Sequence, residues 1–209
     1  LLENGQKITL SDDIQVEQLV RAAYLCNNAR LVPPVENAPE GERQWSILGD
    51  PTEACLRVLG VKSGLHGEEE ESRYPRLFEL PFDSRRKRMS TIHYAGPAPA
   101  GKPIGFYGKN SRLAFVKGAP KETMELCTHK LVNGNELPMD EETRRAALEA
   151  NDRIARDGLR VLAVAQRGIS GNFSEYTEQT VEKDLTFLGL IAMLDPPRKE
   201  VAEAVEKCH

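Results

Sequence analysis

The stretch "FVKGAP", residues 115–120, joins three local patterns in six positions. An apolar run typical of a buried strand stops at Lys117, Gly118 follows, and Pro120 is favoured at the first position of a helix. Because glycine adopts backbone conformations that other residues avoid, the turn can present the lysine at the strand end. The sequence therefore predicts a strand, a tight turn and a helix, with Lys117 placed to meet a negatively charged group.

Further strands are predicted on both sides of this stretch, where apolar runs alternate or continue between turn residues. The segments are RLFELPF (76–82), MSTIHYA (89–95), LRVLAVAQR (159–167) and LTFLGLIAMLD (185–195). "IGFYGKNSRLAFVKG" (104–118) is predicted to form a hairpin with its turn near Lys109 and Asn110.

Helical patterns flank these strands. In "WSILGDPTEACLRVLGV" (45–61) a short strand precedes a helix with Asp50 at the N-cap and Pro51 at the first position. A helix is predicted in 16–30, with Asp12 or Asp13 as its cap, and others are predicted in 119–127 and after 196–200. A longer helix is predicted in 140–158, capped by Asp140 and ended by Gly158. Its residues Leu148, Ile154 and Ala155 lie on one face. The acidic stretch 64–75 is predicted to be solvated and mobile.

The order of these elements indicates the fold class. Strands cluster in the middle of the chain and do not alternate one for one with helices. This pattern favours an α+β fold with a mainly antiparallel β-sheet over a doubly wound parallel sheet.

Composition excludes several classes of protein. The 209 residues are 40% hydrophobic and 29% charged, as in a soluble globular protein, and the net charge of -4 argues against a nucleic-acid partner. No apolar run is long enough to span a membrane, and the first residues lack the order of a signal peptide. The four cysteines are widely spaced, which favours free buried thiols in a reducing compartment.

The stretch "GPAPAGKP" (96–103) nearly matches a phosphate-binding loop but lacks what that loop needs. Pro103 stands where a hydroxyl would bind magnesium, and three prolines remove backbone N–H donors. The histidines lie in unrelated contexts, no nucleophile with its base is visible, and no metal-ligand spacing occurs. No catalytic residue and no metal ligand are therefore predicted, and the sequence indicates a binding protein.

The most basic segment, "PFDSRRKRMS" (81–90), allows three interpretations. It is a nuclear-import or nucleic-acid patch, a solvated hairpin turn, or part of a nucleotide site. The third is favoured by Phe82, because an aromatic ring stacks on a base while nearby cations meet phosphates.

Five motifs occur in an order that resembles one family: GDPTEACL (49–56), FDSRRKRMS (82–90), FVKGAP (115–120), GLRVLAVA (158–165) and MLDPPRKEV (193–201). This order resembles the nucleotide-binding domain of P-type cation-transporting ATPases, in the calcium-pump-like and sodium-pump-like branch and of bacterial type. The resemblance covers nearly the whole chain and implies an α+β fold with an antiparallel β-sheet flanked by helical bundles.

The resemblance implies roles for seven residues in binding ATP. Phe82 would stack on adenine with Met89 packed beside the ring, and Glu53 would accept from the adenine amino group. The cations implied near the phosphates are Lys87, Lys117 and Arg160, with Gly118 forming the turn after Lys117.

Structural alternatives stay open for four of these residues. Glu53 also occupies the capping-box position of its helix, Phe82 and Met89 can be core residues, and Arg160 can be an ordinary surface arginine. Relatives often carry an arginine where this chain has Ser84, so Arg85 or Arg86 is the candidate replacement.

The resemblance also implies a division of labour in a longer protein. The family's phosphorylated aspartate lies in a "DKTGT" motif that this chain lacks, and Asp195 is rejected as a substitute because it begins a proline-stiffened return connection. The implied domains are an ATP-binding domain over residues 1–195 and, over 196–209, a hinge with the start of the connection to a phosphorylation domain.

Several expectations about function follow from this resemblance. The chain would bind ATP, with Mg²⁺ arriving as Mg-ATP, and would not hydrolyse it alone. Its partners would be the phosphorylation, actuator and transmembrane domains of the parent pump, on the cytoplasmic side of the cell membrane. The chain alone would be monomeric, without nucleic-acid or direct membrane contact. Calcium is the first candidate for the transported ion; sodium, potassium, magnesium and protons stay open.

Two rival functions remain. One is a regulatory or protein-interaction domain of the same fold that has lost nucleotide binding. The other is an enzyme in its own right, a phosphatase or a kinase, against which the missing nucleophile counts.

Overall fold

A computed structural model describes residues 2–3, 6–7, 10, 13–34, 44–95, 111–169, 175–194 and 199–208. The main sheet is built from β5 Arg76–Asp83, β6 Arg88–Tyr94, β7 Arg112–Gly118, β8 Cys127–Val132, β9 Asn135–Pro138, β10 Arg160–Ile169 and β11 Leu185–Met193. Two small pairs add β1 Leu2–Glu3 with β2 Gln6–Lys7 and β3 Arg30–Val32 with β4 Ser46–Leu48. The helices are α1 Ile14–Leu25, α2 Pro51–Lys62, α3 Gly67–Arg73, α4 Pro120–Met124, α5 Glu141–Arg156, α6 Glu178–Val181 and α7 Lys199–Cys208.

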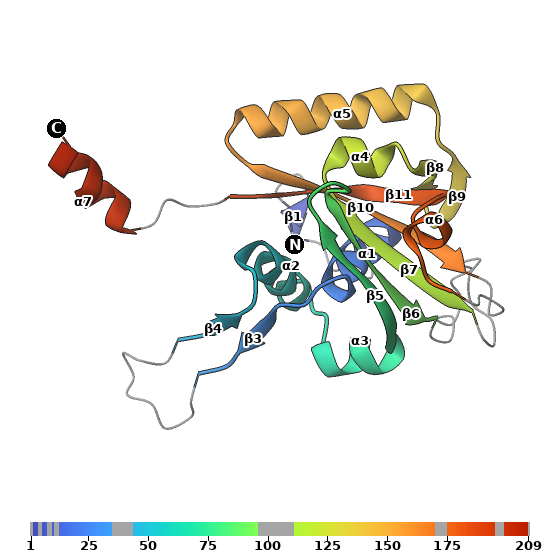
Figure 1. Ribbon diagram of the computed structural model, residues 1–209, viewed down its shortest axis with the longest axis horizontal. Helices are drawn as coiled ribbons and strands as arrows, with labels where there is room; N and C mark the ends of the chain where they lie inside the picture. The colour runs from blue at the N-terminus through green and yellow to red at the C-terminus, as the bar shows by residue number, and fades with distance from the viewer. Residues whose placement is uncertain are drawn as a thin grey trace.

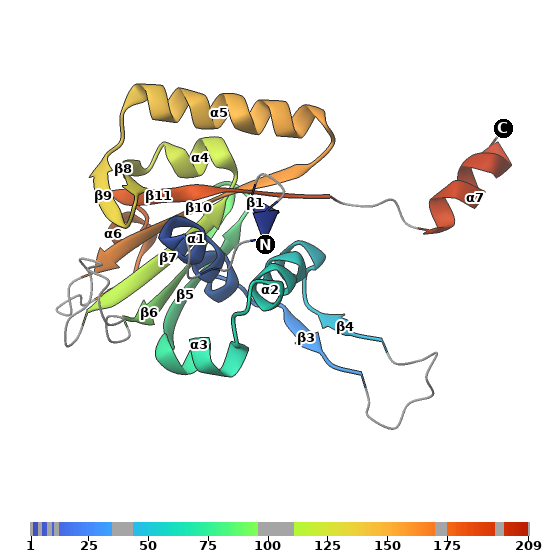
Figure 2. The ribbon, with the colours of Figure 1, turned by 180° about the vertical axis from the view of Figure 1, so that it is seen from behind.

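The seven strands of the main sheet lie in the order β5-β6-β7-β10-β11-β8-β9. Every neighbouring pair is antiparallel except β11 with β8, which is parallel. Helices α1 and α2 lie on one side of this sheet, and α4 and α5 lie on the other (Figures 1 and 2). The predicted α+β fold with a mainly antiparallel sheet between helices is therefore confirmed.

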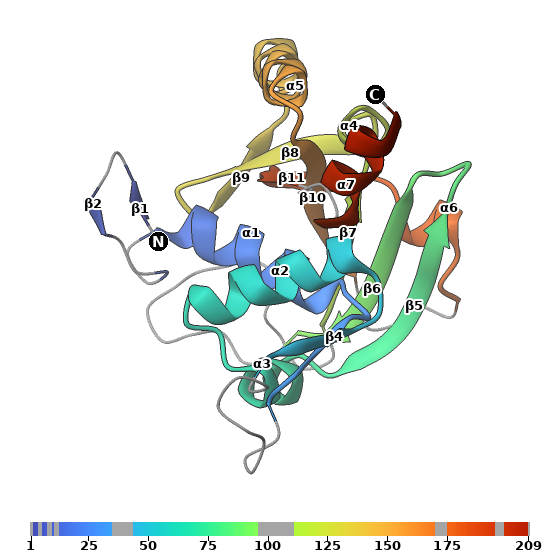
Figure 3. The same ribbon diagram turned by 90° about the vertical axis from the view of Figure 1, so that its left-hand side faces the viewer.

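The core forms because both faces of the sheet are apolar. On the side of α1 and α2, the buried side chains of Leu25, Leu56, Phe115 and Val164 belong to one cluster. Each such side chain stabilises the fold by about 1.5–3 kcal/mol through burial. An edge-on view shows α5 on the opposite side of the sheet from α1 and α2 (Figure 3).

The predicted helix starts are confirmed in three places. Asp13 accepts from the main-chain N–H groups of Gln15 and Val16, at 2.8 and 3.2 Å, and so begins α1. Asp50 and Asp140 cap α2 and α5 in the same way. Side-chain caps satisfy N–H groups that have no partner within the helix.

The acidic segment 64–75 differs in part from the prediction. Most of its residues are exposed as expected, but the segment contains α3, and Glu70 is buried against Arg21, whose Nε lies 2.7 Å from Oε2. A buried cation thus gives a partner to a residue whose sequence context is wholly acidic. On α5, of the three residues predicted to share one face, Leu148 and Ile154 are half-buried and Ala155 is exposed.

The sequence analysis missed the hairpin of β8 and β9. Its turn is Asn133–Gly134, with φ of +50° and +78°. Asn-Gly is a strong signal for such a turn, because both residues tolerate positive φ. The Asn-Gly turn therefore predicts a hairpin, but the flanking strands are too polar to show the apolar alternation typical of a strand.

Other predictions have a simpler outcome. All four cysteines are free thiols, but Cys55 and Cys208 are exposed, so the expectation of burial is wrong for these two. The segment 96–103, the first arm and turn of the predicted 104–118 hairpin, and Asp195 lie outside the described residues. In the described ranges, no helix is both long and apolar enough to cross a membrane.

Candidate functional site

A cavity of about 630 Å³ lies where α2 begins and where β6, β7 and β10 meet the turn after β5. All seven residues predicted to bind ATP line it: Glu53, Phe82, Lys87, Met89, Lys117, Gly118 and Arg160. The other lining residues are Asn28, Asp50, Thr52, Glu79, Pro81, Ala119, Val161 and Leu162. Among the seven predicted residues, Glu53 and Arg160 are 107 positions apart in sequence and are thus brought to one cavity.

Strand register explains how the sheet brings four of these residues together. Met89 of β6 pairs with Lys117 of β7, and Lys117 pairs in turn with Val164 of β10. Gly118 pairs with Arg88, next to Lys87. Because the three strands are antiparallel neighbours, the turn before β6, the end of β7 and the start of β10 meet at one end of the sheet.

Lys117 is nearly buried, with 6% of its surface exposed. Its Nζ lies 2.5 Å from Oε1 of Glu53, at the start of α2. The other carboxylate oxygen of Glu53 accepts from the main-chain N–H of Asn28 at 3.0 Å. The cap of α2 is supplied by Asp50 instead, so both oxygens of Glu53 are bound away from the helix end that the capping-box interpretation assigned to them.

Phe82 lies on β5 with 64% of its surface exposed, although its ring is large and apolar. Met89, by contrast, is 2% exposed and belongs to the main core cluster while it also lines the cavity. Phe82 is therefore not a core residue. Met89 is a core residue and also lines the cavity. An exposed aromatic ring beside cations is the arrangement that stacks on a base.

Lys87 has an unusual backbone, with φ of +53° in a residue other than glycine. Its carbonyl accepts from the N–H of Ala119 at 2.9 Å, which ties the turn before β6 to the end of β7. Its Nζ lies 2.5 Å from Oε1 of Glu122 on α4. This hydrogen bond from Lys87 lowers the pKa of the Glu122 carboxyl.

Gly118 permits the close contact between these two turns. A Cβ at this position would lie 2.5 Å from the Cβ of Arg88 and 2.6 Å from the carbonyl oxygen of Lys87. Any side chain would therefore push Lys87 and Lys117 apart.

Arg160 begins β10, and its Nη1 donates to the hydroxyl of Thr52 on α2 at 2.6 Å. The two arginines considered as replacements at Ser84 do not line the cavity. Arg86 is directed to Glu182, with Nη1 2.5 Å from Oε1. The side chain of Arg85 is 91% exposed and pairs with Asp83.

Sequence reasoning missed the polar residues that surround the predicted ones. Asp50 and Thr52 stand beside Glu53 in the motif "GDPTE" and could have been found there. Asn28 had no such signal: it follows α1, donates from Nδ2 to Glu79 at 2.8 Å, and binds Glu53 through its backbone. It is placed only by the packing of α1 against the sheet.

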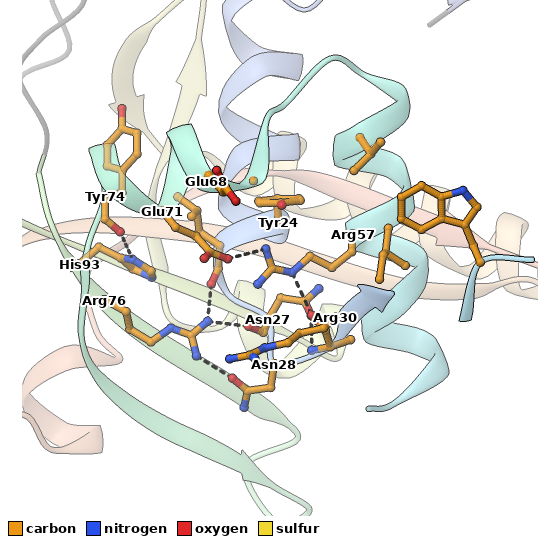
Figure 4. A pocket seen from close by; sticks show the side chains of 16 residues that line it. Tyr24, Asn27, Asn28, Arg30, Arg57, Glu68, Glu71, Tyr74, Arg76 and His93 are labelled. Atoms are coloured by element: carbon orange, nitrogen blue, oxygen red, sulfur yellow. Dashed lines mark hydrogen bonds and ion pairs between the residues drawn. The ribbon is translucent and has the colours of Figure 1, made fainter. Parts of the chain in front are cut away.

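A second and larger cavity, of about 790 Å³, lies beside α3 (Figure 4). Two of its arginines, Arg57 and Arg76, hydrogen-bond to main-chain carbonyls. Arg76 donates from Nη2 to the carbonyls of Leu25 and Asn27 at 2.8 and 2.5 Å, and Arg57 donates from Nε to the carbonyl of Ala29 at 3.1 Å. These bonds satisfy main-chain groups at and after the end of α1, so we assign this cavity a structural role.

Metal ligands are not gathered at either cavity. Within the part of the chain that the structure describes, no group of three or more His, Cys, Asp and Glu side chains could hold a metal ion.

A family model described as "P-type ATPase, cytoplasmic domain N" matches residues 15–200. Since this match covers most of the chain, the chain belongs to that family, and the resemblance found in the motifs is confirmed.

The similar proteins are cation pumps. The chain is 34% identical to calcium-transporting ATPase 1 of Lactococcus lactis over 198 residues, 94% of this chain and 20% of the relative. It is 33% identical to the calcium-transporting ATPase of Bacillus subtilis, over 99% of this chain and 21% of the relative. It is 32% identical to the sodium/potassium-transporting ATPase subunit alpha-4 of Rattus norvegicus, over 91% and 18%. The chain thus spans about a fifth of the length of these relatives.

Proposed function

We propose that this chain is the ATP-binding domain of a cation-transporting P-type ATPase. The observation that carries the proposal is that an exposed aromatic ring, Phe82, lines the same cavity as two lysines, Lys87 and Lys117. The cavity volume of about 630 Å³ falls in the range of roughly 300–1,000 Å³ usual for small-ligand sites.

The residues fit the parts of a nucleotide. The adenine stacks on Phe82 with Met89 beneath it, and the carboxylate of Glu53 accepts from the exocyclic amino group. Lys117, Lys87 and Arg160 lie nearby as cations for the phosphates. Gly118 has no side chain, so the turn that carries Lys87 can pack against the end of β7, which carries Lys117.

Binding and chemistry are divided between domains in this proposal. The domain holds the base end of ATP, and closure of the parent protein carries the γ-phosphate to an aspartate on a separate phosphorylation domain. Magnesium arrives with the nucleotide. The chain alone binds ATP and does not hydrolyse it, with a Kd on the order of 0.1–1 mM, because one stacked base and a few screened charges are set against lost rigid-body freedom. The parent works from the cytoplasmic side of the membrane, with calcium as the first candidate ion.

The direct test is titration of the ¹⁵N-labelled chain with ATP. We expect amides near Phe82, Lys87 and Lys117 to shift, and those around the cavity beside α3 to stay unchanged. If no amide near the first cavity moves, the chain is a regulatory or interaction domain that has lost nucleotide binding. Release of phosphate by the pure chain would instead indicate an enzyme in its own right.

Lys117→Ala tests the cation that is most deeply placed. We expect ATP affinity to fall about three- to tenfold, as for loss of one charge-assisted contact, while adenosine binding changes less. Calorimetry with both ligands measures this difference. Because Lys117 is paired with Glu53, the amide spectrum must show that the variant is folded. Equal losses for ATP and adenosine would contradict a phosphate-directed role.

A further inference from the structure

The carboxylate of Glu182 is fully buried, with 0% of its side chain exposed. It follows the short helix α6, which lies beside β5 and β6 (Figure 3). One oxygen accepts from Nη1 of Arg86 at 2.5 Å and from the hydroxyl of Ser90 at 2.6 Å. The other accepts from Nε of Arg88 at 2.7 Å. A single carboxylate therefore receives three donors from the five-residue segment 86–90.

Two of these donors flank Lys87 in the chain. Arg86 and Arg88 are both directed to Glu182, while the residue between them lines the nucleotide cavity. The backbone of Lys87 is left-handed, with φ of +53°, a conformation that is costly outside glycine and persists only where neighbours hold it. Glu182 supplies this hold from one side, and the hydrogen bond from Ala119 to the Lys87 carbonyl supplies it from the other.

We infer that Glu182 is a positioning residue for nucleotide binding: it fixes Arg86 and Arg88 so that Lys87 faces the phosphates. The inference rests on the function proposed above. Glu182 is not among the residues that line the cavity. It acts by limiting the conformations of the turn between β5 and β6, which lowers the entropy lost when Lys87 binds.

This role differs in a measurable way from a general contribution to stability. If Glu182 acts through Lys87, then the benefit of the Lys87 side chain depends on Glu182. Loss of both groups then costs less than the sum of the single losses. A carboxylate that only stabilises the fold leaves the two effects on affinity additive, once the proteins are compared in their folded state.

The experiment is a double-mutant cycle of wild type, Glu182→Gln, Lys87→Ala and the double variant, with ATP affinity measured by calorimetry. We expect Lys87→Ala to weaken binding about fivefold in the wild-type background and less than about twofold beside Glu182→Gln. Adenosine, which lacks phosphates, should bind all four proteins with affinities within about twofold.

A matched control is Glu178→Gln. This glutamate pairs with the same Arg86 at 3.2 Å and the substitution removes the same charge, but its side chain is 48% exposed. We expect ATP affinity to stay within about twofold of wild type. A loss equal to that of Glu182→Gln would show that net charge, rather than the buried contact, is responsible, and would overturn the inference.

Glu182→Gln leaves two guanidinium groups without their buried partner, so folding is checked by the amide spectrum. If that variant does not fold, Arg88→Gln replaces it in the cycle, because Glu182 then still has Arg86 as a partner. In that cycle too, Lys87→Ala is expected to weaken ATP binding less beside Arg88→Gln than in the wild-type background. Additive losses with normal wild-type binding would overturn the role of Glu182 alone, whereas no ATP binding by wild type would overturn the proposed function and this inference with it.

Discussion

In the cavity beside Phe82 the two lysines pair with side-chain carboxylates, Lys117 with Glu53 and Lys87 with Glu122. In the cavity beside α3, Arg57 and Arg76 also have carboxylate partners, but in addition they donate to main-chain carbonyls at and after the end of α1. A glutamate side chain can turn away and be solvated when a phosphate takes its place. A carbonyl at the end of a helix cannot leave without distorting the backbone. We therefore expect changes in the first cavity to alter binding, and changes in the second to alter stability.

The largest effect is expected for Arg57→Ala in the second cavity. Arg57 donates to the Ala29 carbonyl, pairs with Glu71 at 3.0 Å and lies 4.3 Å from the centre of the Tyr24 ring. Loss of these contacts should lower the free energy of unfolding by about 3–4 kcal/mol. Urea denaturation measures the loss, and the ATP affinity of the folded variant should be unchanged.

The control for Arg57 is Arg30→Ala, which removes an exposed arginine from the same cavity. Its stability should stay within about 0.5 kcal/mol of wild type. A strong loss of ATP affinity in Arg57→Ala would break the division between the two cavities.

The second effect concerns pH and His93, which also lines the cavity beside α3. Burial lowers the pKa of His93 to about 4, and its Nδ1 donates to the Tyr74 carbonyl at 2.8 Å. The folded state thus holds the neutral ring, while the unfolded state takes up a proton below about pH 6.5. The stabilisation that comes from burying the neutral ring is fully present above that pH. The free energy of unfolding should therefore fall by about 2–3 kcal/mol as the pH drops from 6.5 to 4.

The contribution of His93 is isolated by comparison with His93→Gln, in which other titrating groups are unchanged. Unfolding free energies at several pH values should show a shallower decline in the variant than in wild type. If the unfolding free energies of the two proteins fall in parallel with pH, then burial of this imidazole does not cause the loss of stability in acid.

The third effect is on binding. Phe82→Ala removes the exposed ring, and because stacking contributes about 1–3 kcal/mol per base, ATP and adenosine affinities should both fall on the order of tenfold. Thermal stability should change little, since the ring is mostly solvent-exposed. Fluorescence or NMR titration measures both ligands.

Phe78→Ala is the matched control for Phe82. Phe78 lies on the same strand and is 43% exposed, but its ring packs on Tyr176 with centroids 5.4 Å apart. The Phe78→Ala variant should be somewhat less stable than wild type and should keep the wild-type affinity for ATP. Equal affinities for wild type and Phe82→Ala would remove the main support for the nucleotide site.

The smallest effect is a gain. Glu122→Gln releases Lys87 from its carboxylate partner, so an incoming phosphate no longer displaces that partner. Because exposed ion pairs contribute about 0.2–1 kcal/mol, ATP affinity should rise about two- to threefold. The gain should shrink at high salt. A loss of affinity would show that Glu122 helps to hold Lys87 in the binding position.

Local patterns predicted most of the fold. Alternation gave β5 and β6, caps gave the starts of α1, α2 and α5, and the order of elements gave a mainly antiparallel sheet. The failure at α3 has a clear cause: Glu70 looks solvated in a run of glutamates, and only the distant Arg21 makes its burial possible. The β8–β9 hairpin was not predicted, although the Asn133–Gly134 turn is a local signal in the sequence.

The candidate site was predicted less evenly. The motifs named seven lining residues, and Glu53 was left between cap and ligand because both uses need the same residue at the same position. Pairings across the cavity were not predictable. Lys117 meets Glu53 and Lys87 meets Glu122 only because α2 and α4 approach the sheet from opposite sides.

The sequence by itself determined the class of fold and the family, and its motif order indicated seven of the residues that line the cavity beside Phe82, since these depend on periodicity, turn chemistry and motifs along the chain. Tertiary structure decided the rest: the partner of each lysine, the exposure of Phe82, and the buried Glu182 behind the Lys87 turn. The physical reason is that electrostatic partners and burial are properties of distance in space. Residues 92 to 96 positions apart, such as Glu182 and its three donors, acquire that distance only when the sheet assembles.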